Sequence, residues 1–183
     1  MTWQVDTAHT HIGFVARHMM ITKVRGEFSK YDIEVDYNED NPALSSVSAT
    51  IYTDSVNTRD ERRDGHLRSA DFFDAANHPA MTFRSTRVEA LPNGHGRLIG
   101  DLTIRGVTRE VALDVEFYGL AKSPWGTTSA GFCGLTKIDR RDWNLTWNQA
   151  LETGGWLVGD QINIEIEIEL VKVPETQAEA VAA

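Results

Sequence analysis

The chain has 183 residues and a mass of 20.5 kDa, a length at which a single domain can bury its own core. Its net charge of −9 excludes general attraction to nucleic acid and disfavours broad adsorption to anionic membranes. Hydrophobic residues make up 41% and charged residues 25%, so the composition indicates neither a disordered nor a membrane-embedded chain.

Residues 2–53 alternate in the manner of β-strands. Apolar residues occupy even positions from Val24 to Phe28 but odd positions from Ile33 to Tyr37. Because side chains of a strand alternate with a period of two, this parity must be reset near residues 29–31 by a bulge or a bend. A long bent strand favours a barrel over a flat sheet.

Residues 54–85 contain the one substantial helical insertion that the sequence predicts. Thr58 can cap a turn, and Leu67 and Phe73 then follow near helical spacing until Asn77, His78 and Pro79 end the pattern. We therefore expect a short amphipathic helix around residues 59–76 that places Leu67 and Phe73 against an apolar surface.

The second half of the chain returns to strands and tight turns. Residues 92–94 and 105–107 are typical of turns, whereas residues 139–160 are aromatic and irregular. From Ile162 to Leu170, isoleucines alternate with acidic residues, which predicts a strand with one buried and one wet face. The polar, alanine-rich residues 174–183 are predicted to form a disordered tail.

These runs predict an all-β fold, an extended eight-stranded antiparallel lipocalin-like barrel with one short helical insertion. Gly26, Gly100 and Gly134 fall inside strands, where a barrel needs curvature or close backbone approach. The sequence shows no repeat and no second domain, so we expect residues 1–173 to form one domain.

The lone cysteine and the first residues bear on the compartment. Cys133 cannot form an internal disulfide, and no base lies near it in sequence, so we expect a buried, inert thiol. The sequence opens on a strand-like pattern without a positive or apolar leader segment, and it contains no run of about 18 apolar residues. We therefore expect a cytoplasmic protein without stable membrane insertion.

Short motifs spread over about residues 2–173 point to a family. They are DTAHT (6–10), IGF (12–14), HMM (18–20), VRGEF (24–28), DSVNT (54–58), RDGHLRSADFFD (63–74), PAMTFRS (79–85), GDLTIRGVT (100–108) and VGD (158–160). In this order they make the chain resemble the YceI-like family of lipid-binding, lipocalin-like β-barrel proteins. Asn144 stands where the family pattern tends to have glycine, and since Asn tolerates a left-handed backbone we expect the turn to be kept.

The resemblance implies a function for the barrel. It implies an apolar tunnel that binds a long-chain lipid, such as a polyisoprenoid, a polyprenyl phosphate or a quinone precursor, so that the protein acts as carrier or store. It implies no reaction, and relatives make a homodimer plausible. Many relatives carry a secretion signal and work in the periplasm, which this sequence does not indicate.

Lipid binding requires a dry lining and an opening. The apolar candidates for the lining are Phe14, Phe28, Leu67, Phe72, Phe73, Phe83, Leu102, Phe132 and Trp143. For any single one of them, a role as ordinary core is the simpler interpretation. We interpret the helical insertion as a flap beside the barrel mouth.

Polar candidates are fewer. A lipid headgroup needs hydrogen-bond donors, and we expect these at Arg63, His66, Arg68 and His18. Arg63 and Asp64 can equally fix the start of the helix. The histidines bring no ligand pairs at zinc-like spacing, so we predict no metal site and no cofactor other than the lipid.

Two other classes of function stay open at this point. One is an enzyme that acts on isoprenoid lipids, for which no nucleophile motif is found. The other is an interaction module whose barrel is packed solid and holds no ligand.

Overall fold

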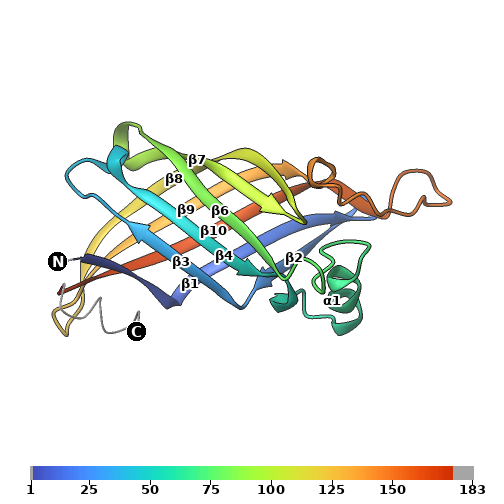
Figure 1. Cartoon of the computed structure of the whole chain (residues 1–183), viewed down its shortest axis with the longest axis horizontal. Coiled ribbons are helices and arrows are strands. Elements are labelled where there is room, and N and C mark those ends of the chain that lie inside the picture. The colour runs from blue at the N-terminus through green and yellow to red at the C-terminus, as the bar shows by residue number, and fades with distance from the viewer. Residues whose placement is uncertain (1, 175–183) are drawn as a thin grey trace.

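The computed structural model describes residues 2–174 and shows one antiparallel sheet of ten strands in the order β3-β4-β6-β7-β8-β9-β10-β1-β2-β5 (Figure 1). The sheet curls into an elongated barrel. Its strands are β1 (Thr2–His18), β2 (Thr22–Phe28), β3 (Tyr31–Asp36), β4 (Ser46–Tyr52), β5 (Val56–Asn57), β6 (Ala80–Ala90), β7 (His95–Ile104), β8 (Val107–Lys122), β9 (Thr128–Asp139) and β10 (Val158–Val173). The helix α1 (Glu61–Arg68) and four short 3₁₀ turns complete the fold: η1 (Pro42–Leu44), η2 (Thr53–Ser55), η3 (Pro92–Gly94) and η4 (Arg140–Trp143).

The all-β antiparallel barrel is confirmed, but the count of eight strands is wrong. The predicted bend between Phe28 and Tyr31 interrupts hydrogen bonding, so that β2 pairs with β1 whereas β3 pairs with β4. The single bent strand expected over residues 24–37 is therefore two strands, and the sequence gives no signal for the two-residue β5, which pairs with the end of β2. The tail predicted over 174–183 lies, apart from Pro174, outside the described residues.

The alternation of β10 shows why these residues form this sheet. Ile166 and Ile168 face the interior opposite Gly134 and Phe132 of β9, while Glu167 between them faces water. Burying one face and wetting the other fixes the register, because a slip by one residue would put every glutamate inside. The predicted two-faced strand is confirmed.

Side chains, rather than a ladder, bring β3 against β1. Among residues 2–174 the two strands share no strand pairing, but the Tyr31 hydroxyl donates a hydrogen bond to the Thr10 carbonyl at 2.8 Å. Near the start of β1, the indole N–H of Trp3 donates to Glu39 at 3.2 Å, and its ring meets Tyr37 edge-on. The barrel is thus closed by a seam of side-chain contacts.

The turns follow the chemistry that the sequence indicated. Arg105 and Gly106 connect β7 to β8 with φ of 49° and 76°, the left-handed pair that a two-residue hairpin turn requires. Asn144 also adopts the left-handed conformation, with φ of 60° and ψ of 21°. The turn expected at Asn144 is therefore kept.

The helical insertion is shorter than predicted. The helix covers only Glu61–Arg68, since Asp60, and not Thr58, caps it by accepting from the Arg63 amide at 3.0 Å. At the other end the Ser69 hydroxyl donates to the His66 carbonyl at 2.6 Å, after which residues 70–78 run as successive turns. A serine that bonds the backbone locally competes with further helix.

A bulge interrupts β1 between Asp6 and His11. The Asp6 carboxylate accepts from the Ala8 amide at 2.9 Å and lies 2.9 Å from Nδ1 of His9. The Thr10 hydroxyl donates to the Asp6 carbonyl at 2.7 Å, which fixes the far side of the bulge. The DTAHT motif therefore has a structural role in shaping β1.

The Asp6–His9 pair predicts how this bulge responds to pH. The hydrogen bond with Asp6 raises the pKa of His9, and the same hydrogen bond lowers the pKa of Asp6. The contribution of His9 to stability is complete below its ordinary pKa of about 6.5 and is lost as pH rises through the raised value. The contribution of Asp6 is complete above its ordinary pKa of about 3.9 and is lost as pH falls through the lowered value.

We expect an NMR titration to place the pKa of His9 above its ordinary value in the wild-type protein. In Asp6→Asn the pKa of His9 should move back down, because the charged partner is gone. The signals of His11 and His18, which also belong to β1, serve as internal references. A His9 pKa that is the same in both proteins would contradict the pairing.

Candidate functional site

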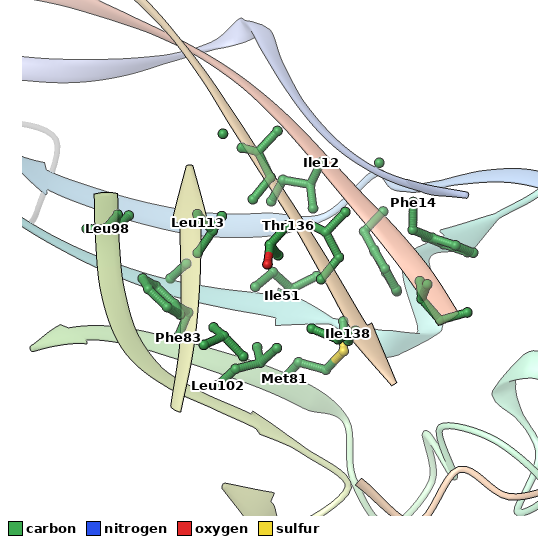
Figure 2. A pocket seen from close by; sticks show the side chains of 18 of the residues that line it. Ile12, Phe14, Ile51, Met81, Phe83, Leu98, Leu102, Leu113, Thr136 and Ile138 are labelled. Atoms are coloured by element: carbon green, nitrogen blue, oxygen red, sulfur yellow. The ribbon is translucent and has the colours of Figure 1, made fainter. Parts of the chain in front are cut away.

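The barrel encloses a cavity of about 670 Å³ that is lined mainly by inward apolar side chains of the strands. Figure 2 shows part of its lining, to which β4 contributes Ile51, β6 Met81, β8 Leu113 and β9 Ile138. Of the residues labelled there, Thr136 alone carries a polar side chain. This part of the cavity therefore offers almost no hydrogen bonding.

The interior is hollow rather than packed solid. Phe14, Phe83 and Leu98 point into the barrel, yet their side chains are only half-buried because they face empty space. In a solid core such residues would be fully buried and would touch neighbours on all sides. The solid-barrel alternative therefore does not describe this structure.

Two glycines leave space for aromatic rings to lie close to the backbone of the barrel wall. A Cβ on Gly26 would come within 2.3 Å of the Phe14 ring, and one on Gly100 within 2.6 Å of the Phe83 ring. The close approach expected at these two positions is confirmed. At Gly134 a Cβ would meet its nearest neighbour at an ordinary 3.5 Å, so that glycine does not serve a close approach.

The two ends of the barrel differ. β1 begins and β10 ends at one end of the barrel (Figure 1). There the rings of Tyr37, Phe117 and Phe132 pack across the interior with centroids 5.1 to 6.4 Å apart. At the other end lie α1 and the turns that follow it. Phe73 from these turns packs edge-on against Phe28, with centroids 5.6 Å apart.

An aromatic cluster joins the helical insertion to the loop of residues 144–157. The rings of His66 and Trp147 stack edge-on with centroids 4.5 Å apart, and Phe72 lies 5.1 Å from His66 and 5.5 Å from Trp147. All three line the cavity. The insertion thus forms part of the wall at one mouth of the barrel, as the flap interpretation expects.

Most of the predicted site residues line the cavity. The cavity lining includes every apolar candidate and three headgroup candidates: Phe14, Phe28, Leu67, Phe72, Phe73, Phe83, Leu102, Phe132, Trp143, Arg63, His66 and His18. Arg68 lies outside the lining, where it pairs with Glu61 at 2.8 Å and donates to the Asp54 carbonyl. Whether the lining residues bind lipid stays a prediction.

Arg63 and Asp64 hold the start of the insertion through Thr58. The buried Asp64 carboxylate accepts from the Thr58 amide at 2.8 Å and from its hydroxyl at 2.6 Å. Arg63 donates to the same hydroxyl at 2.7 Å and to the Thr58 carbonyl at 2.8 Å. The expected structural role is thus present, and the remaining guanidinium donors of Arg63 are at the cavity edge.

Sequence reasoning missed Arg140. This side chain is only 4% exposed and donates to the carbonyls of Leu145, Trp147 and Gly159 at 2.6, 2.9 and 3.0 Å. It therefore ties the 144–157 loop to the first residues of β10. An arginine in a loop carries no pattern that distinguishes this role, because its acceptors are backbone groups that meet only in the fold.

Cys133 and a cluster around Asp6 are two further polar features of residues 2–174. Burial raises the pKa of the Cys133 thiol, which keeps it protonated and unreactive. Asp6, His9 and Glu169 come within 4.8 Å of one another on the outside of the barrel, a grouping that the sequence analysis missed because Glu169 belongs to another strand. His9 is already paired with Asp6 there, as described above.

None of the helices in residues 2–174 has the length and apolar character needed to cross a membrane.

Comparisons with known proteins agree with this architecture. A UPF0312 protein of Staphylococcus aureus (strain N315) is 36% identical over 165 residues, which cover 90% of this chain and 94% of the relative. The crystal structure of a Campylobacter jejuni YCEI protein superposes with a TM-score of 0.75 at 34% identity, covering 86% of this chain and 90% of that one.

A more distant neighbour shares the fold. It is a polyisoprenoid binding domain from Saccharophagus degradans, implicated in plant cell wall breakdown, with a TM-score of 0.66 at 14% identity over 95% of this chain and 99% of that one. A model of the YceI-like domain matches residues 3–170. Sequence, relatives and fold therefore agree, and the chain belongs to the YceI-like domain family.

Proposed function

We propose that this protein binds a long-chain apolar lipid of the polyisoprenoid class inside the barrel and acts as its carrier or store. The observation that carries the proposal is the hollow interior, a cavity of about 670 Å³ that is lined mainly by apolar side chains. An apolar cavity of this kind gains little from water and much from hydrocarbon.

Hydrocarbon burial alone can supply the affinity. Each CH₂ group moved from water to an apolar surrounding contributes about 0.8 kcal/mol, so several prenyl units suffice without a polar anchor. A linear chain also suits a barrel interior, which is long and only wide enough for one slender ligand. The S. degradans domain named for polyisoprenoid binding shares only the fold, and it supports the proposal to that extent.

A headgroup would lie at the α1 end. Arg63, His66 and His18 line the cavity there and can donate hydrogen bonds to a phosphate or a quinone oxygen. The opposite end is crossed by the Tyr37, Phe117 and Phe132 rings, which suit the end of a hydrocarbon chain. Glu89, His95 and Arg97 also line the cavity, near the turn between β6 and β7. The donors at the α1 end favour a polyprenyl phosphate or a quinone precursor as ligand.

We propose binding without catalysis. The alternative, an enzyme acting on isoprenoid lipids, needs a nucleophile or an acid–base pair facing the cavity. Among the lining residues around the α1 mouth, the charged or titratable groups are the histidines and arginines already assigned to the headgroup or to the fold, together with Arg17. No observation favours the enzyme over the carrier.

Native mass spectrometry and organic extraction of the purified protein test the proposal. We expect a co-purified polyprenyl compound, or uptake of an added one with a stoichiometry of one per chain. Absence of both, from protein that is folded by circular dichroism, would overturn the proposal.

Phe73→Asp should weaken lipid uptake more than Glu167→Ala. Phe73 lines the cavity beside Phe28, whereas Glu167 lies on the wet face of β10. A carboxylate at position 73 would bring charge and water to the mouth. Uptake measured by fluorescence titration should separate the two variants, and equal effects would argue against the placement of Phe73.

A matched pair of substitutions tests the hollow interior. Ala49→Leu adds its extra carbons into the cavity, so we expect unfolding free energy to change by less than about 1 kcal/mol while lipid affinity falls roughly tenfold. Ala130 is 0% exposed in a packed cluster with Trp3 and Leu170, and Ala130→Leu should cost about 1–3 kcal/mol. Equal destabilisation in denaturant titrations would mean that the two sites are equally full.

A further inference from the structure

The turn between β1 and β2 exposes large apolar side chains beside the cavity. Met19, Met20 and Ile21 are 39%, 65% and 73% exposed, and Trp156 of the 144–157 loop is 56% exposed. Figure 1 shows this turn, that loop and α1 at the same end of the barrel. We call these four side chains the apolar tip.

Backbone contacts hold the apolar tip together and join it to the cavity. The Met19 amide donates to the Leu157 carbonyl at 2.8 Å, and both Leu157 and the preceding His18 line the cavity. The Met20 sulfur lies directly against Gly155, where a Cβ would come within 2.5 Å of it. The tip is therefore a built rim of the cavity and not a set of scattered exposed residues.

The turn is poorly suited to stability alone. Met19 and Met20 have φ of 52° and 64°, the left-handed region where a residue with a Cβ costs roughly 1–2 kcal/mol. A hairpin turn of this shape favours Asn and Gly, and neither occurs here. Strain that is held at exposed apolar residues indicates that these side chains serve a function other than folding.

Unpaired cations surround the apolar tip. Arg17 and Lys23 are cross-strand neighbours at the base of the turn, a pairing of like charges that is unfavourable in itself. Within residues 2–174, neither of them forms an ion pair, and neither do Arg59 and Arg62 at the start of the α1 segment, which lies at the same end of the barrel. Several acidic groups nearby are already engaged: Glu61 with Arg68, Asp71 with His66, Asp139 with Arg141 and Asp160 with Arg140.

We propose that the apolar tip docks the barrel mouth onto the surface of a phospholipid bilayer that contains anionic lipid. Methionine, isoleucine and tryptophan side chains can enter the headgroup region, where tryptophan is especially favoured. Each unpaired Arg or Lys close to the surface adds attraction to anionic headgroups. The proposal rests on the proposed function, because it assigns the membrane as the place where lipid enters and leaves the cavity.

Charge on the rest of the molecule fixes the orientation. With a net charge of −9, the outer faces of the strands are repelled by an anionic membrane, whereas Arg17 and Lys23 at the base of the apolar tip are attracted to it. An approach with this end brings the cavity rim into contact with the bilayer. A flat adsorption along the barrel is disfavoured by the same repulsion.

Flotation with vesicles tests the docking directly. We expect the protein to bind vesicles of phosphatidylcholine mixed with phosphatidylglycerol, and to bind those of phosphatidylcholine alone more weakly. The double variant Met20→Glu/Ile21→Glu, and Trp156→Glu, should each bind at least roughly tenfold more weakly. Arg17→Gln/Lys23→Gln should lose the preference for phosphatidylglycerol.

Trp125→Glu is the matched control. Trp125 is 88% exposed but lies in the β8–β9 turn at the opposite end of the barrel, so its substitution should leave vesicle binding unchanged. Circular dichroism verifies that each variant is folded. Failure of the wild-type protein to bind vesicles, or equal losses at positions 125 and 156, would overturn the docking.

Two further measurements distinguish membrane docking from the proposed lipid binding and from dimerisation through the apolar tip. Uptake of a polyprenol added from ethanol should be unchanged in Met20→Glu/Ile21→Glu, since neither residue lines the cavity. Vesicle binding without any polyprenol uptake would refute the proposed function and leave the docking intact. If light scattering shows a dimer that Met20→Glu/Ile21→Glu dissociates, the tip is an interface between copies and the docking is refuted.

Discussion

The structure depends on one constraint, which is that backbone ladders, more than side chains packed in the middle of the barrel, hold the wall in place. Nine of the ten strands form long antiparallel pairings, and β5 adds two residues. Because the wall is self-supporting, inward residues such as Phe83 and Leu98 can remain half-buried beside empty space. A ligand can then supply the apolar contacts that a solid core would have made.

The sequence predicted the structure correctly wherever a feature depended on residues close together in the chain. The parity change across residues 29–31, the alternation of Ile162 to Leu170 and the turn at Arg105 and Gly106 each depend on neighbours in the chain, and each is present in the structure. The number of strands could not be predicted in the same way. A bend interrupts hydrogen bonding only if different strands lie next to its two halves, and this is decided by the tertiary fold.

The same distinction between local patterns and tertiary contacts applies to the site residues. Apolar candidates such as Phe14 and Phe73 could be chosen because their motifs pointed to a barrel interior, and they do line the cavity. The orientation of Arg68 away from it could not be read, since both faces of so short a helix are charged. Arg140 and Trp147 act through backbone carbonyls and ring contacts brought together by tertiary structure alone.

The seam between β3 and β1 allows the circumference of the barrel to change. Elsewhere, widening the wall would break a continuous row of backbone hydrogen bonds, but here it disturbs side-chain contacts such as Tyr31 with Thr10. Local opening is least costly where few backbone bonds are lost. A bulkier guest would therefore be accommodated by spreading this seam, with the remaining strands moving as a rigid shell.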